Sequence, residues 1–492
     1  MPPSGNDRVT ADAHGTLNPT MAVLSKHPVS APPSAPVREK TRHILLRGWC
    51  IVVLFLALSG VSWVNAIGAV AASVLTVAAS VVSLVLWVAV RPPVNWRRVP
   101  WFPMAYLVWA ALSVVWSQWP ATTAITWGLL VLTTMQGLFV AAVLTWREIL
   151  RTIGSAVKWC LGLSILFELA VAVFVRGPLL PEFVIPAQRA ADPIVYWCRG
   201  NLFNGGRIQG IFGNANLLAI VALVGIIVFA VRIAAGAPRR PLFVAWIVLA
   251  AYLMYRGSSA TVYLSAVMAL LVLVTVLLMR TAPTPARRTL YYALFAVVGV
   301  GGALTAWLLR DTVFTALGRS ADLTGRERIW QAVLERVGER PVVGWGFATP
   351  WLPFDPHFDR WIVDHGQSVM QAHNMWIDVA LQLGVIGVVI MALLYLAFLW
   401  RTWFFAVDRP RWDLRADRPY SPLSLAPTLI AAVLVVQGIA ESEPLLLWGW
   451  MFVVMLAFKI KQSPHVGVGP AEQRVAIERG ELVADGGPGA PA

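Results

Sequence analysis

The stretch that decides the fold is residues 48–90, GWCIVVLFLALSGVSWVNAIGAVAASVLTVAASVVSLVLWVAV, which contains no charged residue. A helix needs about 20 predominantly apolar residues to cross the hydrocarbon core of a bilayer. This run is about twice that length, and a second uncharged run of similar length covers residues 99–146. The two runs together predict four membrane-spanning helices in the first third of the chain.

The composition extends this prediction to the whole chain. Of its 492 residues, 58% are hydrophobic and only 13% are charged, whereas soluble domains have about 25% charged residues. The formal net charge of +14 would suggest a nucleic-acid partner for a soluble protein. In a membrane protein, basic residues instead flank the cytoplasmic helix ends. We therefore expect a polytopic membrane protein whose surroundings are the lipid bilayer, with no nucleic-acid partner.

The fold class predicted is all-α: a polytopic membrane helix bundle with a folded extracytoplasmic loop. Apolar runs predict about twelve spans, with tight turns near Asn65 and Arg256. The predicted spans are 45–64, 66–90, 100–117, 123–145, 153–175, 211–231, 241–255, 257–279, 289–309, 374–400, 424–440 and 444–460.

The distribution of Lys and Arg predicts the orientation, because these residues are enriched in cytoplasmic connections. With the N-terminus in the cytoplasm, the short connections rich in Lys and Arg lie inside and the short outer turns carry only Arg256. Both termini are then cytoplasmic, and the long loops 176–210 and 310–373 lie outside. We expect residues 44–460 to form the membrane domain, and residues 1–43 and 461–492 to be disordered tails.

The sequence of the loop 310–373 predicts a folded segment. Residues 324–346, TGRERIWQAVLERVGERPVVGWG, open with a capping box formed by Thr324 and Glu327. Apolar residues then recur at helical spacing, and Pro341 ends the helix. The members of this apolar stripe are Ile329, Trp330, Val333, Leu334 and Val337.

Several polar residues gather on the predicted outer side. His373 and Asn374 stand where the outer loop meets the tenth span, and the outward arginines are Arg207, Arg256, Arg326 and Arg328. Guanidinium groups beside an imidazole suit a phosphate-bearing ligand, because Arg binds phosphate through paired hydrogen bonds. The alternative for the arginines is solvated surface charge, and the alternative for His373 is a structural role.

Two further polar residues lie inside predicted spans. Asn216 opens the sixth span and Glu168 lies well inside the fifth. A charge within the hydrocarbon region usually marks a polar cavity or an ion pair, and an asparagine there often bonds between helices. We expect Asn216, Glu168 and Asn374 to support the site, with interhelical hydrogen bonding as the alternative for Asn216.

The sequence has no phosphate-binding loop, no HExxH or GxSxG motif and no zinc-ligand spacing. Glu441 and Glu443 are the nearest approach to a paired-carboxylate metal site, with a polar turn as the alternative. We therefore expect neither a metal nor a cofactor.

Four motifs of this sequence resemble those of the O-antigen ligase and polymerase superfamily of membrane glycosyltransferases. They are GRERIW (325–330), PVVGWG (341–346), AHNMWIDVALQLGVIG (372–387) and the upstream GRIQGIFGNAN (206–216). The resemblance implies a GT-C-like membrane enzyme that needs neither nucleotide nor metal. Such an enzyme moves a glycan from undecaprenyl diphosphate to an acceptor hydroxyl at the outer face, with inversion. By this resemblance His373 matches the general base, and Arg207 and Arg326 match the arginines that hold the diphosphate.

Three interpretations remain open at this point. A ligase transfers the glycan to a different molecule, a polymerase transfers it to a second lipid-linked repeat, and we favour the ligase. A protein of another class, a transporter or flippase of lipid-linked saccharide, would have a similar number of spans. The partners expected in the first two interpretations are a lipid-linked glycan donor and a glycan or glycolipid acceptor.

Overall fold

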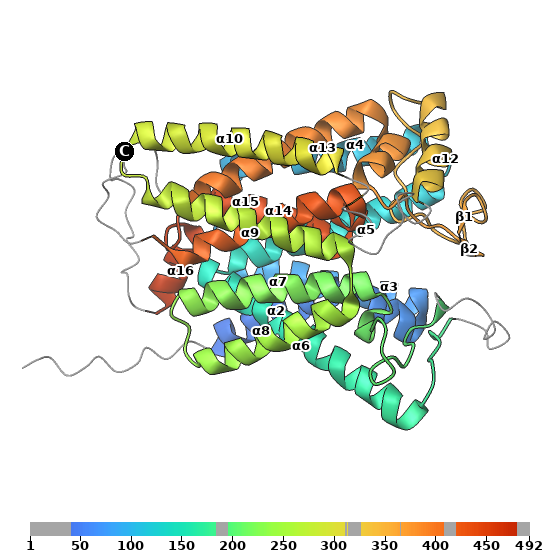
Figure 1. Ribbon diagram of the computed structural model, residues 1–492, viewed down its shortest axis with the longest axis horizontal. Coiled ribbons are helices and arrows are strands. Elements are labelled where there is room, and N and C mark those ends of the chain that lie inside the picture. The colour runs from blue at the N-terminus through green and yellow to red at the C-terminus, as the bar shows by residue number, and fades with distance from the viewer. Residues whose placement is uncertain are drawn as a thin grey trace, which may run out of the picture.

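The computed structural model describes residues 41–183, 195–309, 312, 326–364, 366–407 and 420–479. Its long helices run side by side along the long axis of the molecule (Figure 1). They are α2 (Thr41–Leu58), α3 (Gly60–Val90), α4 (Trp101–Leu112), α5 (Pro120–Val143), α6 (Trp146–Ala170), α7 (Ala215–Ala234), α8 (Arg240–Gly257), α9 (Ala260–Thr281), α10 (Pro285–Leu308), α13 (Met375–Val407), α14 (Leu425–Ala440) and α15 (Leu447–Gln462). Each predicted span overlaps one of these helices, which confirms the all-α class.

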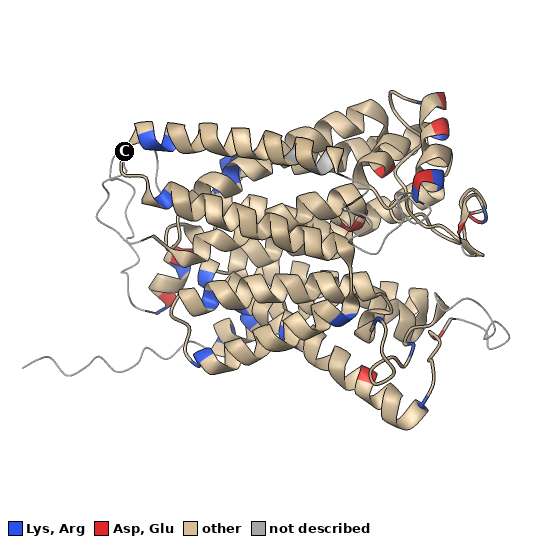
Figure 2. Cartoon of the chain, in the orientation of Figure 1, with Lys and Arg blue, Asp and Glu red and all other residues tan. Residues whose placement is uncertain are grey.

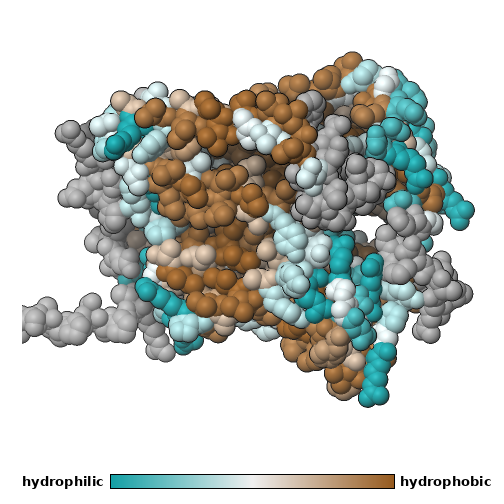
Figure 3. Space-filling model, viewed as in Figure 1, coloured by the Kyte–Doolittle hydropathy of each residue, from teal (hydrophilic) through white to brown (hydrophobic). Residues whose placement is uncertain are grey.

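Eight helical segments of the described chain are long and apolar enough to cross a bilayer. Of the remaining long helices, α4 and α15 have only 12 and 16 residues, and α8 has an arginine near each end. Large apolar side chains such as Val70, Val85 and Leu270 are exposed on the outside of the bundle. Figure 3 shows a hydrophobic belt between two more polar ends on one face of the molecule. A belt of this kind is expected where helices contact lipid, and the chain is an integral membrane protein.

Two breaks interrupt the first uncharged run, where we expected a turn near Asn65. The helix α2 ends at Leu58, α3 begins at Gly60, and the second break occurs at Gly68. Asn65 is buried, and its side-chain amide donates to the carbonyl oxygen of Phe212 at 3.3 Å. The backbone carbonyl of Asn65 accepts from the N–H of Glu182 at 2.9 Å, and the predicted turn near Asn65 is confirmed as the break at Gly68. The predicted break near Arg256 is confirmed, since α8 ends at Gly257.

Two glycine-containing segments cross where α13 is broken. Gly384 has φ +64° inside α13, and a Cβ there would collide with the carbonyl group of Val342. The N–H groups of Trp345 and Gly346 donate to the carbonyls just before the break, and the N–H of Val385 donates to Pro341 O at 2.8 Å. Backbone groups freed by the break are thus paired within the protein, as an interruption at membrane depth requires.

The loop between α10 and α13, which we call the outer loop after its predicted side, is folded around a small core. The helix α12 (Arg326–Glu339) lies with the hairpin strands β1 (Val363–Asp364) and β2 (Gln367–Ser368) at one end of the bundle (Figure 1). Ile329 and Val333 are buried, as their spacing predicted, whereas Leu334 is exposed. The core of this loop also contains Trp119, Ala348, Trp351, Phe358, Ile362, Val369, Ala372 and Leu381. The predicted capping residue Thr324 lies outside the described residues.

The opposite end of the bundle carries α16 (Pro470–Glu478), and Lys and Arg are frequent there (Figure 2). The buried Lys459 ammonium lies 3.0 Å from the Glu472 carboxylate and donates to Leu144 O at 2.7 Å. Arg474 also donates to Val143 O, at 2.6 Å. The prediction of a disordered tail from residue 461 is therefore wrong for residues 461–479, because these contacts hold α16 on the bundle.

The orientation can be tested with a cysteine on each end. We expect Gln367→Cys, on the exposed side of β2, to react with a membrane-impermeant thiol reagent in intact cells. Gln473→Cys, exposed on α16, is the matched control and should react only after lysis. The native cysteines Cys50, Cys160 and Cys198 are free and fully buried, so background labelling should be low. The opposite labelling pattern would reverse the assignment of sides.

Candidate functional site

His373 lies where the folded outer loop enters α13. Asn374 caps this helix, because its side-chain oxygen accepts hydrogen bonds from the N–H groups of Trp376 at 2.9 Å and Ile377 at 3.2 Å. His373 itself has φ +51°, in the left-handed region. A residue other than glycine is strained in that conformation, and residues strained in this way concentrate at functional sites. The capped helix start thus fixes the direction in which the imidazole points.

Glu441 connects His373 to Arg326. One carboxylate oxygen of Glu441, Oε2, lies 2.9 Å from Nδ1 of His373, and the other, Oε1, accepts from Nη2 of Arg326 at 2.6 Å. The second terminal nitrogen of Arg326 donates to the carbonyl oxygen of Ala440. The three side chains come from the turn after α14, from α12 and from the start of α13, so the site is assembled only in the folded protein.

A second arginine joins the same carboxylate through an asparagine. Asn216, on the first turn of α7, donates to Oε1 of Glu441 at 3.4 Å and accepts from Nη2 of Arg207 at 2.6 Å. Arg207 also donates through Nε to Gly257 O at 2.8 Å. The structure therefore brings together four of the residues singled out in the sequence, His373, Arg326, Asn216 and Arg207, around a fifth, Glu441.

Asp378 ties the two backbone segments of the site to each other. This side chain, one turn into α13, is 1% exposed and accepts from the backbone N–H of Ala372 at 3.1 Å. It also accepts from the hydroxyl of Ser442. Ala372 precedes His373 and Ser442 follows Glu441, so Asp378 holds the imidazole and its carboxylate partner in register.

Glu441 and Glu443 lie in the turn of residues 440–444, AESEP, which follows α14 and is called the AESEP turn below. Their carboxyl groups differ in charge. Burial alone would raise the pKa of Glu441, but the hydrogen bond from His373 and the guanidinium of Arg326 outweigh it and hold this pKa below its ordinary value. Burial, together with the charge of Glu441, raises the pKa of Glu443 to about 8. At neutral pH Glu441 is therefore a carboxylate, whereas Glu443 is largely protonated.

The tautomer of His373 follows from this arrangement. A carboxylate accepts hydrogen bonds, so the proton of the neutral imidazole resides on Nδ1, which faces Glu441. The side-chain amide of Gln371 is also 3.4 Å from Nδ1, a longer and uncharged contact. Nε2 then carries the free lone pair. The His373 side chain is 33% exposed against 4% for Glu441, so the imidazole is the accessible base of the pair.

The other predicted site residues lie in different surroundings. Arg256 donates to the backbone carbonyls of Asn201 at 2.8 Å and Leu202 at 3.1 Å, and so it holds the loop that precedes Arg207. The Arg328 side chain is 66% exposed and pairs with Asp364 at 3.4 Å. Neither contact tests whether these two arginines bind a ligand, and that role stays a prediction.

Glu168 is buried beneath the first outer loop. One of its carboxylate oxygens accepts from the N–H groups of Gln209 and Gly210, each at 2.8 Å, and the other faces the Cys198 thiol at 3.3 Å. These contacts organise the loop that carries Arg207. Glu168 therefore holds the backbone of that loop, and its supporting role at the site stays a prediction.

In the sequence, Glu441 suggested only a metal site or a polar turn. Among the described residues, no group of three or more His, Cys, Asp and Glu side chains is placed to hold a metal ion. A carboxylate at the end of a long apolar span was the available signal, because such a charge is costly unless it is paired. Its partner, 68 residues earlier in the chain, could not be identified from the sequence.

Comparisons with known proteins agree with the motifs. Residues 244–392 match the O-antigen ligase family, a range that includes Arg256, Arg326 and His373. The exopolysaccharide production protein ExoQ of Rhizobium meliloti (strain 1021) is 29% identical over 151 residues, which cover 30% of this chain and 34% of that protein. The match thus spans about a third of the relative's length. Both findings are similarities to the O-antigen ligase and polymerase superfamily, and the family match covers the part of the chain that carries three of the quoted motifs.

Proposed function

We propose that this protein transfers a glycan from a polyprenyl diphosphate carrier, of the undecaprenyl type, to an acceptor hydroxyl during cell-surface polysaccharide assembly. The observation that carries the proposal is the His373–Glu441 pair, with Arg326 and Arg207 around the same carboxylate. The family match and the similarity to an exopolysaccharide production protein support the same class of reaction.

In the proposed reaction His373 is the general base. A sugar hydroxyl has too high a pKa to attack unaided, and a positioned base contributes about 10²–10⁴-fold. Nε2 of His373 takes the hydroxyl proton while the oxygen attacks the anomeric carbon of the donor. The Glu441 carboxylate then stabilises the imidazolium that forms, because it already hydrogen-bonds to Nδ1.

The leaving group is the carrier diphosphate. As the bond between the anomeric carbon and the phosphate oxygen breaks, negative charge grows on the diphosphate, and fixed cations lower the barrier if they face it. Arg326 and Arg207 are proposed for this role. Both guanidiniums are already oriented, by Glu441 and Asn216 respectively, so little conformational freedom is lost when the donor binds. Attack from the face opposite the diphosphate inverts the anomeric centre.

A reconstituted reaction tests the proposal. Purified protein in a bilayer is mixed with a lipid-linked glycan and with candidate acceptors, and products are separated by mass. A glycan joined to a different acceptor would identify a ligase, the activity we favour, and a lengthened lipid-linked glycan would identify a polymerase. Movement of the donor across the bilayer without any new glycosidic bond would contradict the proposal and indicate a flippase.

The reaction is expected to be independent of added metal. Arg326 and Arg207 would neutralise the leaving diphosphate, the task that Mg²⁺ performs in many phosphate-transfer enzymes. Activity should therefore survive EDTA at a concentration that removes divalent cations. Loss of activity with EDTA, followed by recovery with Mg²⁺ or Mn²⁺, would contradict this expectation and direct attention to the AESEP turn.

A further inference from the structure

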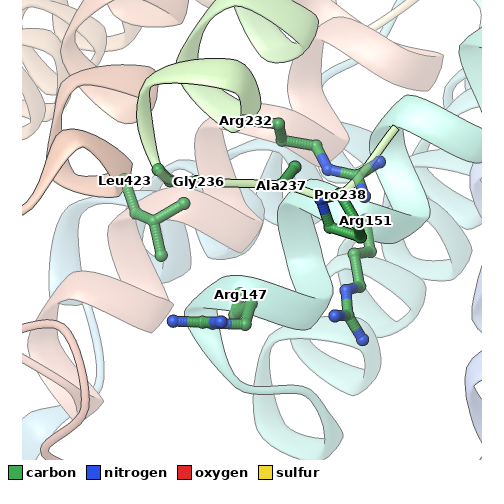
Figure 4. A pocket seen from close by; sticks show the side chains of 8 residues that line it. Arg147, Arg151, Arg232, Gly236, Ala237, Pro238 and Leu423 are labelled. Atoms are coloured by element: carbon green, nitrogen blue, oxygen red, sulfur yellow. The ribbon is translucent and has the colours of Figure 1, made fainter. Parts of the chain in front are cut away.

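A second set of arginines lies at the end of the bundle that carries α16. Arg147 and Arg151, one turn apart near the start of α6, and Arg232, in the last turn of α7, line one hollow together with residues 235–238 and Leu423. Figure 4 shows these three side chains around the Gly236–Pro238 segment. We call this hollow the arginine pocket. It takes no part in the reaction proposed above.

The charges that line this pocket all have the same sign. Among the described residues that line it, none is acidic. Glu148, which lies between Arg147 and Arg151 in the chain, instead hydrogen-bonds to His43 at 2.6 Å and completes the capping box of α6. Arg147 lies in the first turn of α6, near the positive end of the helix dipole, where an anion is favoured.

The position of Arg232 is fixed by its neighbours. Its guanidinium carbon is 4.5 Å from the ring centroid of Phe243, a cation–π contact. Gly154 leaves room for it, because a Cβ on that glycine would be 3.3 Å from Nη1 of Arg232. One cation of the pocket is therefore held in place before any ligand arrives, which lowers the entropic cost of binding.

We propose that the arginine pocket binds a phosphate group, supplied by the headgroup of an anionic membrane lipid. Guanidinium groups match phosphate oxygens through paired hydrogen bonds. The pocket lies at the ends of the membrane-spanning helices α6 and α7, at the depth where lipid headgroups are found, and basic pockets between such helix ends bind anionic lipids. The hollow, with the open space at its mouth, measures about 380 Å³.

The test is binding of phosphatidylglycerol to the full-length protein in phosphatidylcholine nanodiscs, followed by native mass spectrometry. Arg147→Gln with Arg151→Gln should weaken retention of this lipid by about tenfold or more, since each charge-assisted hydrogen bond lost has an effect of that order. The matched control is Arg239→Gln with Arg240→Gln, which removes two exposed charges next to the pocket that do not line it. The control should stay within about twofold of the wild type.

Equal retention by the pocket variant and the wild type would overturn the proposal, as would an equal loss in both double variants. Arg147→Lys with Arg151→Lys, which keeps the charges but not the paired hydrogen bonds, should fold normally and bind with intermediate strength. Inorganic phosphate at millimolar concentration, added in pure phosphatidylcholine, distinguishes the source of the phosphate. A thermal shift with inorganic phosphate but none with phosphatidylglycerol would overturn the lipid as the source and identify a soluble phosphate ligand.

Discussion

Replacing His373 with alanine is expected to lower turnover by about 10²–10⁴-fold while donor binding stays nearly unchanged. The loss corresponds to roughly 3–5 kcal/mol of transition-state stabilisation, the contribution of a positioned general base. Donor affinity should persist because a neutral imidazole contributes little to holding a diphosphate, and because Arg326 keeps its carboxylate partner in this variant.

The measurement is donor affinity beside turnover, at matched expression and with folding checked. His357→Ala is the matched control, since His357 lies in the same outer loop, is 43% exposed and pairs with Asp355 instead of Glu441. It should retain activity close to that of the wild type. Arg326→Ala and Arg207→Ala should behave differently from both, weakening donor binding by about 1.5–3 kcal/mol each for a lost charge-assisted hydrogen bond.

One outcome would remove His373 from the role of base. If His373→Ala lost donor binding while turnover per bound donor stayed normal, the imidazole would be a binding or structural residue. Other titratable residues near the outer side are Glu168 and Asp378, but both are buried and their carboxylates accept backbone hydrogen bonds. Neither could then take a proton from an incoming hydroxyl without rearrangement. His365, a third alternative base in the sequence, lies outside the described residues.

The spans were predictable because each is decided locally. A run of apolar residues about 20 long needs no knowledge of the rest of the chain to be assigned to a membrane. All twelve predicted runs overlap helices, and eight helical segments of the described chain are long and apolar enough to cross a bilayer. The error occurs where tertiary contacts decide the outcome. The segment after residue 461 looks like a tail but is held by Glu472 and Arg474.

The candidate site was predictable in its motif residues and unpredictable in its centre. His373 stands out as the titratable residue at a span entrance, and Arg326 begins an amphipathic helix. Glu441 stands out only as a carboxylate at the end of an apolar span, and its role is not apparent because its partners lie 68 and 115 residues away in the chain. The position of Glu441 between two apolar spans predicts its depth in the membrane, but it does not predict which residues lie next to it. Only the fold brings the carboxylate beside the imidazole.

Glu441→Gln is the second variant expected to have a large effect. Glutamine has nearly the same size but no charge, so the imidazolium formed during the reaction would lose its stabilising partner. The amide could also donate a hydrogen bond to Nδ1 and thereby favour the wrong tautomer of His373. In serine proteases the corresponding exchange of carboxylate for amide costs about 10⁴-fold in turnover. We expect a loss on the order of 10²–10⁴-fold here.

Glu441→Ala should in addition destabilise the protein. This effect distinguishes the contact of Glu441 with Arg326 from its contact with His373. The Arg326 side chain is only 13% exposed, and removing one member of a buried ion pair costs about 3–5 kcal/mol because the other charge is left uncompensated. Adding Arg326→Gln to Glu441→Ala should therefore recover part of the lost thermal stability without recovering activity. A double variant less stable than Glu441→Ala alone would contradict the pairing.

Glu443→Gln is the control for both variants of Glu441, because it changes a carboxyl group in the same turn. The pKa of Glu443 is raised to about 8 by burial and by the charge of Glu441, so this group is already largely neutral at pH 7 and an amide imitates its protonated form. Its Oε2 atom also makes no hydrogen bond to any described residue. Turnover of Glu443→Gln at pH 7 should stay within a few-fold of the wild type. If instead Glu443→Gln lost activity as strongly as Glu441→Gln, the effect would belong to the turn as a whole, and the carboxylate beside His373 would have no special part in the reaction.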